Sequence, residues 1–234
     1  MSAEELGRLG LKYGSTKIQY TAYFEAYARA FHELRGKEEA RVLEIGIDRG
    51  GSHRMWAEYM PNATIFGIDP FHLPESVFPR GGQPDDIREQ LEAEGVRTFE
   101  GNQLDRRDLQ KFIDRHGTGF DVIIDDAAHM PDAIQISLGY LFPHLKSGGS
   151  YFVEDLMCAA DRQNRIAEVN KKIKGLLKIP HVVDYHLSES VNALQKSRAW
   201  LSTVLTPDEK DYLVENIATC QFLANSNLCQ IVKK

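Results

Sequence analysis

The stretch Val122-Ile-Ile-Asp-Asp-Ala-Ala-His129 decides how the chain is interpreted, because an apolar strand in it runs directly into two carboxylates and an imidazole. In open α/β sheets, ligands bind outside the carboxyl ends of the strands, so charged side chains at such an end favour a binding site more than charges on a helix face do. The same residues also fit a solvated turn after a core strand. The rest of the chain has to distinguish these two interpretations.

Strands and helices are predicted to alternate on both sides of this stretch. Predicted strands cover Arg41 up to a glycine-rich turn that ends at Gly51, then Ala63–Asp69, Val96–Glu100, Val122 onward and Ser150–Val153. Predicted helices cover Ser52–Tyr59, Ile87–Glu94, Leu109–His116 and Ala133–Leu141. This alternation is typical of an α/β fold with a parallel, doubly wound sheet.

Further elements are predicted toward both ends. Residues 1–40 are expected to be helical, with one apolar face formed by Tyr20, Tyr23, Phe24, Tyr27, Ala28 and Phe31. A turn is expected at 145–149, helices at 160–180 and 188–216, and a terminal hairpin from 217–224 and 228–233. We expect a single domain over 1–234, in which 1–40 is a helical or lid region and 41–234 is a Rossmann-like core.

The composition is that of an ordinary globular domain. Hydrophobic residues make up 42% and charged residues 26% of the 234 residues, which is near the average for globular proteins. The net charge is −6, and no basic run with interleaved aromatic residues occurs, which argues against nucleic acid as the main partner. A small molecule is the expected ligand.

The cysteines and the apolar runs indicate the compartment. Cys158, Cys220 and Cys229 lack the spacing of a zinc site or a disulfide framework, which favours free thiols in a reducing environment, although a Cys220–Cys229 pair across the hairpin stays open. No run approaches the roughly 20 apolar residues of a membrane span. We therefore expect a cytoplasmic protein without a membrane partner.

The glycine-rich turn after the first strand resembles a ligand-binding turn. Gly46 and Gly50 permit close approach of a ligand, and the following helix begins with free amides. Asp48 occupies a position where a dinucleotide-binding fingerprint has glycine, which disfavours a nicotinamide or flavin cofactor. Glu44, near the end of an apolar strand, needs hydrogen-bond partners or a cationic neighbour there.

Polar residues follow the next two strands. Asp69 lies a little under twenty positions past the glycine turn, a separation that suits a carboxylate bound to ribose hydroxyls. An acidic residue at a strand end is also a common turn former. Gln103, after the third strand, fits either a base-edge contact or the closing of a turn.

The segment Lys12-Tyr13-Gly14-Ser15-Thr16-Lys17 interrupts the N-terminal helical region. Gly14 and Ser15 fit the break between two helices and the cap of the second one. The alternative is a lid over a ligand, and the local chemistry leaves both open.

Taken together, these signals resemble class I S-adenosylmethionine-dependent methyltransferases, whose fold is a seven-stranded Rossmann-like sheet with a C-terminal antiparallel hairpin. Tyr-Gly-Ser at 13–15, the run from Gly50 to Trp56, Asp-Asp-Ala-Ala-His and Glu154-Asp155 are similar to the metal-dependent O-methyltransferases of antibiotic sugars. The resemblance covers most of the chain. It implies donor-binding residues at Tyr13, Ser15, Glu44, Gly46, Gly50, Ser52, Asp69, Gln103 and Asp125.

The same resemblance implies a site for Mg²⁺ or a similar divalent cation on Asp126, Glu154 and Asp155, with His129 as the general base. Neighbouring strands lie roughly 4.8 Å apart, so two strand ends can bring these carboxylates around one point. Because adjacent strand residues face opposite sides, Glu154 and Asp155 can share an ion only if the strand has ended before them. Acidic caps on a loop, and a structural histidine, are the competing interpretations.

The implied reaction is methyl transfer from S-adenosylmethionine to a sugar hydroxyl of a glycosylated natural product in antibiotic biosynthesis, by a homo-oligomer, most simply a dimer. The sequence leaves two alternatives open. One is methylation of a catechol-like phenol, and the other is a non-catalytic nucleoside-binding protein of the same fold. No part of the sequence identifies the acceptor.

Overall fold

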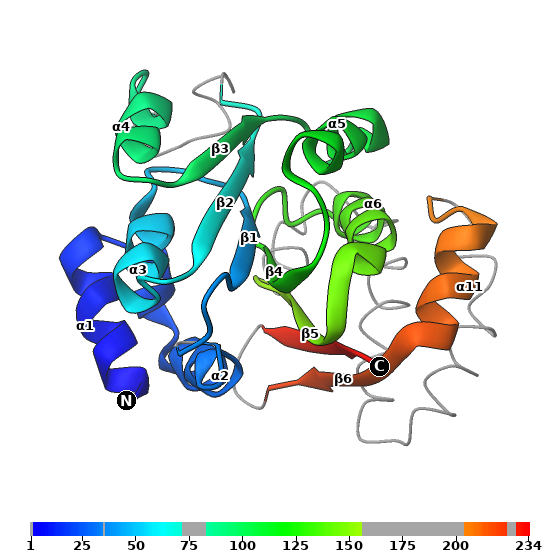
Figure 1. The fold of residues 1–234 in the computed structure, drawn as a ribbon, viewed down its shortest axis with the longest axis horizontal. Coiled ribbons are helices and arrows are strands. Elements are labelled where there is room, and N and C mark those ends of the chain that lie inside the picture. The colour runs from blue at the N-terminus through cyan, green and yellow to red at the C-terminus, as the bar shows by residue number, and fades with distance from the viewer. Residues whose placement is uncertain (1, 35, 72–82, 156–203, 224–227) are drawn as a thin grey trace, which may run out of the picture. The chain divides into compact units, whose positions relative to one another are not determined.

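The structure is a computed structural model of the chain, and it describes residues 2–34, 36–71, 83–155, 204–223 and 228–234 (Figure 1). The hydrogen-bonded strand order is β3-β2-β1-β4-β5-β7-β6. This order, with its antiparallel C-terminal strands and N-terminal helices, confirms the predicted fold class. The chain divides into two compact units, Met1–Asn102 and Gln103–Lys234, and the single-domain organisation stays a prediction.

The first unit contains the N-terminal helices and three parallel strands. Its elements are α1 (Ala3–Tyr13), the 3-10 helix η1 (Thr16–Gln19), α2 (Thr21–Phe31), β1 (Arg41–Ile45), α3 (Gly51–Tyr59), β2 (Thr64–Asp69), α4 (Ile87–Ala93) and β3 (Arg97–Glu100). Strand β2 pairs with β1 and β3, and both pairs are parallel. These bounds agree closely with the predicted elements.

Aromatic packing fixes the helices of this unit. The predicted apolar face of α2 is buried through Tyr23, Phe24, Tyr27 and Phe31. Trp56 of α3 lies edge-on to Tyr27 and Phe31, with ring centroids 5.0 and 5.2 Å apart. Helix α1 lies beside α3 (Figure 1). This packing holds α3, and with it the glycine-rich turn that precedes α3.

The second unit combines two parallel strands with the antiparallel hairpin. Its elements are α5 (Arg106–His116), β4 (Phe120–Asp125), α6 (Pro131–Leu141), the 3-10 helix η2 (Phe142–His144), β5 (Leu145–Val153), α11 (Pro207–Asn216), β6 (Ile217–Phe222) and β7 (Cys229–Lys233). Strand β5 is parallel to β4 and antiparallel to β7, which is antiparallel to β6. The predicted hairpin is confirmed.

The prediction of a simple turn over 145–149 is wrong, because β5 already begins at Leu145. Leu145 pairs with Phe120, and the next paired position is Ser150 with Val122, so four residues bulge out opposite Asp121. Gly148 has a φ of 75° within this bulge. Gly148 and Gly149 therefore mark an interruption inside a strand.

Helix α5 begins three residues before the predicted Leu109, because the carboxylate of Asp105 accepts a hydrogen bond from Arg107 N at 2.8 Å and caps the helix.

In the hairpin, Cys220 and Cys229 are free thiols whose sulfurs lie 3.6 Å apart. Among the described helices, none has the length and apolar character that a membrane crossing requires.

Some predictions lie outside the described residues. The helix at 160–180 and Cys158 belong to this group. Of the predicted helix at 188–216, the described part contains α11, whose first turn is closed by a capping box between Thr206 and Glu209.

Candidate functional site

In the first unit, the glycine turn (residues 46–51) joins β1 to α3 in a conformation that needs its glycines. Gly46 and Gly50 have φ values of 97° and 73°, where a side chain would be strained. Gly50 is the N-cap of α3 and supplies no side-chain cap. The first amides of α3 are thus oriented as in sites where helix N-termini bind anionic or polar ligand groups.

Asp69 holds this turn from the neighbouring strand. Its carboxylate accepts hydrogen bonds from Ile47 N at 2.8 Å, Phe71 N at 2.7 Å and Gln83 Nε2 at 3.3 Å. The side chain is buried, with 4% of the residue surface exposed. The turn-forming interpretation of Asp69 is therefore confirmed, and its contact with a ribose stays a prediction.

Glu44 has the partners that its buried position requires. Its carboxylate pairs with Lys17 Nζ at 2.9 Å, accepts a hydrogen bond from Trp56 Nε1 at 2.8 Å and lies 3.6 Å from His53 Nδ1. Burial works to raise the pKa of Glu44, but the charges of Lys17 and His53 outweigh it, so that the pKa lies below its ordinary value. The predicted cationic neighbour is Lys17.

The segment around Gly14 breaks one helix and caps the next, which was the first of the two predictions for it. Gly14 ends α1 with a φ of 67°, and Ser15 Oγ accepts a hydrogen bond from Lys17 N at 3.4 Å at the start of η1. Tyr13 donates its hydroxyl hydrogen to Glu58. Whether Tyr13 and Ser15 contact a ligand stays a prediction.

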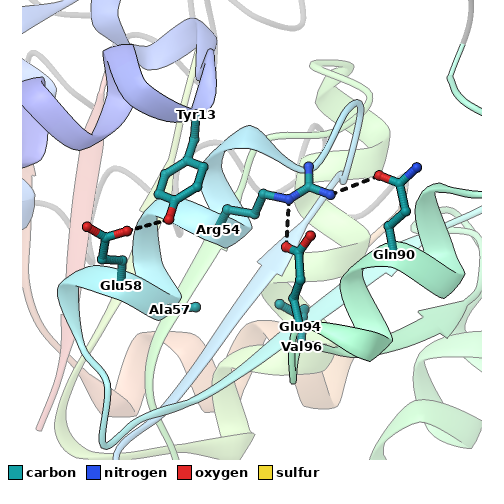
Figure 2. A pocket seen from close by; sticks show the side chains of 7 residues that line it. All are labelled: Tyr13, Arg54, Ala57, Glu58, Gln90, Glu94 and Val96. Carbon is teal, nitrogen blue, oxygen red and sulfur yellow. Dashed lines mark hydrogen bonds and ion pairs between the residues drawn. The ribbon is translucent and has the colours of Figure 1, made fainter.

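A groove of about 560 Å³ lies beside these residues, and Figure 2 shows its lining: Tyr13, Arg54, Ala57, Glu58, Gln90, Glu94 and Val96. Arg54 lies across it and donates hydrogen bonds to Glu94 at 2.6 Å and Gln90 at 3.1 Å. Because Arg54 is already paired within the groove, it is not a free anion-binding group. Of the predicted site residues, Tyr13 is the one that lines this groove.

In the second unit, Asp125 is the centre of a buried network. Its carboxylate accepts hydrogen bonds from Gln103 Nε2 at 2.6 and 2.7 Å, from Tyr151 OH at 3.2 Å and from Ser137. Burial raises the pKa of Asp125 above its ordinary value, although the hydrogen bonds from Ser137 and Gln103 oppose this.

Gln103 extends this network to the loop after β4. Its Oε1 accepts a hydrogen bond from Ala128 N at 3.2 Å while its Nε2 binds Asp125. One side-chain amide thus connects the strand end to the loop that carries Asp126 and His129. Gln103 and Asp125 support this loop, and a contact of either residue with a methyl donor stays a prediction.

The candidate metal site consists of Asp126, His129 and Asp155, whose ligand atoms all lie within 4.8 Å of one another. His129 Nε2 lies 3.8 Å from Asp126 Oδ1 and 3.8 Å from Asp155 Oδ2. The three side chains are between 17% and 23% exposed, so an ion can reach them. Asp126 and Glu154 also present carboxylate oxygens within 4.8 Å of each other.

The backbone makes this grouping possible. Strand β5 ends at Val153, so Glu154 and Asp155 follow the strand, as sharing one ion requires. Glu154 N still donates to Asp125 O at 2.9 Å, whereas Asp155 turns away with a φ of 52°. His129 has a φ of 50°. Such left-handed conformations cost energy in residues other than glycine and are concentrated at functional sites.

Lys17, Ser137 and Tyr151 belong to these networks, and none of them was predicted as a site residue from the sequence. Lys17 had one available signal, namely the requirement of Glu44 for a cation. Ser137 and Tyr151 lie within a helix and a strand and carry no local signal, because their role depends on packing against Asp125.

The strand order and the glycine turn define the Rossmann-like methyltransferase fold. In agreement, the chain aligns over 98% of its length with the MycE methyltransferase from the mycinamycin biosynthetic pathway, solved in complex with Mg and SAH, at a TM-score of 0.69 and 25% identity, covering 54% of that chain.

Sequence comparison leads to sugar O-methyltransferases. The chain is 34% identical over 163 residues to 8-demethyl-8-(2-methoxy-alpha-L-rhamnosyl)-tetracenomycin-C 3'-O-methyltransferase of Streptomyces olivaceus, covering 66% of this chain and 37% of the relative. It is 32% identical to mycinamicin VI 2''-O-methyltransferase of Micromonospora griseorubida, with the same coverage. No protein-family model matches. The chain spans little more than a third of the length of these relatives. Their identities confirm the predicted resemblance to antibiotic-sugar O-methyltransferases.

Proposed function

We propose that the chain transfers the methyl group of S-adenosylmethionine to a sugar hydroxyl of a glycosylated small molecule, with Mg²⁺ or a similar divalent cation as cofactor. The observation that carries the proposal is the cluster of Asp126, His129 and Asp155. A carboxylate oxygen of Glu154 also lies within 4.8 Å of one of Asp126. The proposal is supported by the names of the relatives, which are sugar O-methyltransferases, and by MycE, which was solved with Mg and SAH.

The cluster fits a hard divalent cation. Asp126, Glu154 and Asp155 offer carboxylate oxygens, the ligands that Mg²⁺ prefers, and Mg²⁺ commonly uses a few carboxylates and leaves its other positions to water or substrate. A cation bound here supplies Lewis acidity, which lowers the pKa of a coordinated hydroxyl.

His129 is proposed as the general base. Its imidazole would take the proton of the acceptor hydroxyl while the oxygen forms a bond to the donor methyl group and the sulfonium becomes a neutral sulfide. Histidine is the side chain that most often serves as a general base in enzymes, which suits this role. The position of Nε2, 3.8 Å from both Asp126 and Asp155, also suits a metal ligand, and the two roles separate when metal affinity and turnover are measured in His129→Ala.

The methyl donor is proposed to bind at the glycine turn. Gly46, Gly50 and Ser52 provide close backbone approach and the N-terminus of α3, and Asp69 fixes the turn. Glu44, Gln103 and Asp125 are almost entirely buried, so we assign their contribution to the residues they hold. Tyr13 and Ser15 are proposed to border the donor.

The proposal is tested by a methyl-transfer assay with labelled S-adenosylmethionine and a set of glycosides, before and after chelation by EDTA. We expect transfer to stop on chelation and to return when Mg²⁺ is restored. Unchanged transfer after rigorous chelation would eliminate the metal role.

The acceptor set separates the alternatives. Transfer to catechols in preference to glycosides would favour the phenol alternative, and donor binding in calorimetry without transfer to any acceptor would favour a non-catalytic protein. The homodimer and the cytoplasmic location stay predictions.

A further inference from the structure

Among the lysines and arginines that the structure describes, Lys17 is the most deeply buried, with 2% of its surface exposed. Its ammonium lies 2.9 Å from Glu44 Oε1, and Glu44 itself is 0% exposed. A charge removed from water in this way is tolerated when it is paired with an opposite charge in good geometry. Lys17 belongs to η1 and Glu44 to β1, so the ion pair joins the N-terminal segment to the strand that leads into the glycine turn.

The same carboxylate also holds α3. Trp56 Nε1 donates to Glu44 Oε2 at 2.8 Å, and His53 Nδ1 lies 3.6 Å from that oxygen. Glu44 therefore connects three elements, which are η1, β1 and α3. Removing Lys17 would leave Glu44 charged inside this cluster, with the link to η1 broken.

An independent contact places the N-terminal turn, defined as residues 13–17, against the glycine turn. A Cβ atom on Gly51 would lie 2.8 Å from Tyr13 O and 3.0 Å from Ser15 N, distances that are too short for a side chain to fit without movement. The backbone of the N-terminal turn thus lies directly on the first residue of α3. Lys17, two residues after Ser15, fixes it there.

We propose that Lys17, through Glu44, is a positioning residue that holds Tyr13 and Ser15 against the N-terminus of α3 and so shapes the methyl-donor site. The proposal rests on the proposed function, because that function places the donor at this helix end. Lys17 does not contact the donor. It acts by fixing the segment that borders the donor.

The test compares Lys17→Met with the double variant Lys17→Met/Glu44→Gln. The single variant leaves a buried uncompensated charge and is expected to be destabilised, whereas the double variant removes both charges and keeps an acceptor for Trp56. If Lys17 is a positioning residue, the double variant recovers thermal stability but binds S-adenosylhomocysteine about tenfold more weakly in calorimetry, within the range usual for coupling between sites.

Lys111→Met is the matched control, because Lys111 lies on α5 and pairs with Asp108 at the surface. It is expected to bind S-adenosylhomocysteine like the wild type. Recovery of wild-type binding together with stability in the double variant would overturn the proposal, since Lys17 would then serve stability alone.

Hydrogen exchange of the free protein distinguishes failure of this inference from failure of the proposed function. We expect faster exchange of the amides in residues 13–17 of the double variant, with the amides of β3 unchanged. Unaltered exchange would refute the positioning role whatever the ligand. If the wild type binds no S-adenosylhomocysteine, the donor assignment is refuted, and exchange still reports whether Lys17 holds the turn.

Discussion

The carboxylates at the strand ends are of two kinds. Glu44 and Asp125 are almost completely buried and surrounded by hydrogen-bond donors, whereas Asp126 and Asp155 are about one fifth exposed and lie around an imidazole. A buried carboxylate with its lone pairs engaged fixes the elements around it. A group of partly exposed carboxylates close to each other is suited to a cation. Neighbouring acidic residues, such as Asp125 and Asp126, thus have different surroundings, and we propose different functions for them on this basis.

The strongest test of this distinction is Asp126→Asn. Asp126 lies in the cluster with His129 and Asp155 and also within 4.8 Å of Glu154. Its loss should reduce methyl transfer by more than about 100-fold, since even outer-shell partners of a metal commonly contribute 10- to 100-fold. Initial rates at several Mg²⁺ concentrations measure the effect, and higher Mg²⁺ should restore part of it.

Asp132→Asn is the matched control, because Asp132 is an exposed acid in the first turn of the nearby helix α6. It should keep wild-type rates and the wild-type Mg²⁺ dependence. Equal losses in the two variants would contradict the assignment of Asp126.

A smaller effect is expected for Gln103→Leu. The Gln103 side chain binds Asp125 and Ala128 N, and neither residue is a candidate metal ligand. The variant should therefore release the loop but keep the candidate ligands. We expect turnover to fall about 10-fold, in the range of outer-shell changes, together with a lower denaturation midpoint because Asp125 loses a donor.

Gln110→Leu, on the exposed part of α5, is its control, and neither quantity should change by much. A loss of stability in Gln103→Leu with unaltered turnover would show that the network serves folding alone.

The difference between the two kinds of carboxylate was only partly predictable from the sequence. Strand ends and acidic residues are local features, so the positions of Asp69, Asp125 and Asp155 followed from hydrophobic patterning. Burial and partners depend on residues far away in the chain. Lys17 is 27 positions before Glu44, and nothing local to Lys17 distinguishes it from a surface lysine.

Dependence on residues far away in the chain also explains why the bulge in β5 and the backbone conformations at the candidate metal site were not predicted. The bulge in β5 depends on the pairing of β5 with β4, which turn composition at Gly148 cannot reveal. The left-handed backbone of His129 and Asp155 brings their side chains to one point, and residue type alone does not predict it. The proposed metal ligands thus come from the resemblance, whereas the grouping of their side chains required the structure.

The smallest expected effect concerns the buried kind of carboxylate and its dependence on pH. The folded protein holds the pKa of Glu44 below its ordinary value of 4.5, so the stabilisation from its ionised form is fully present above that value. It is lost as pH falls through the lower pKa of the folded state. The free energy of unfolding of the wild type should therefore fall relative to that of Lys17→Met/Glu44→Gln as pH decreases through the folded-state pKa of Glu44. Urea unfolding between about pH 3 and pH 7 measures this.

Glu58→Gln separates the effect of burial from that of pairing alone. The pKa of Glu58 is also lowered, by hydrogen bonds from Lys12 and Tyr13, but this carboxylate lies at the surface, where solvent screens its interactions. Glu58→Gln should follow the wild-type pH dependence closely. If Glu58→Gln changes the acidic part of the stability–pH curve as much as the double variant does, pairing alone determines the effect. Burial is then not what distinguishes the two kinds of carboxylate.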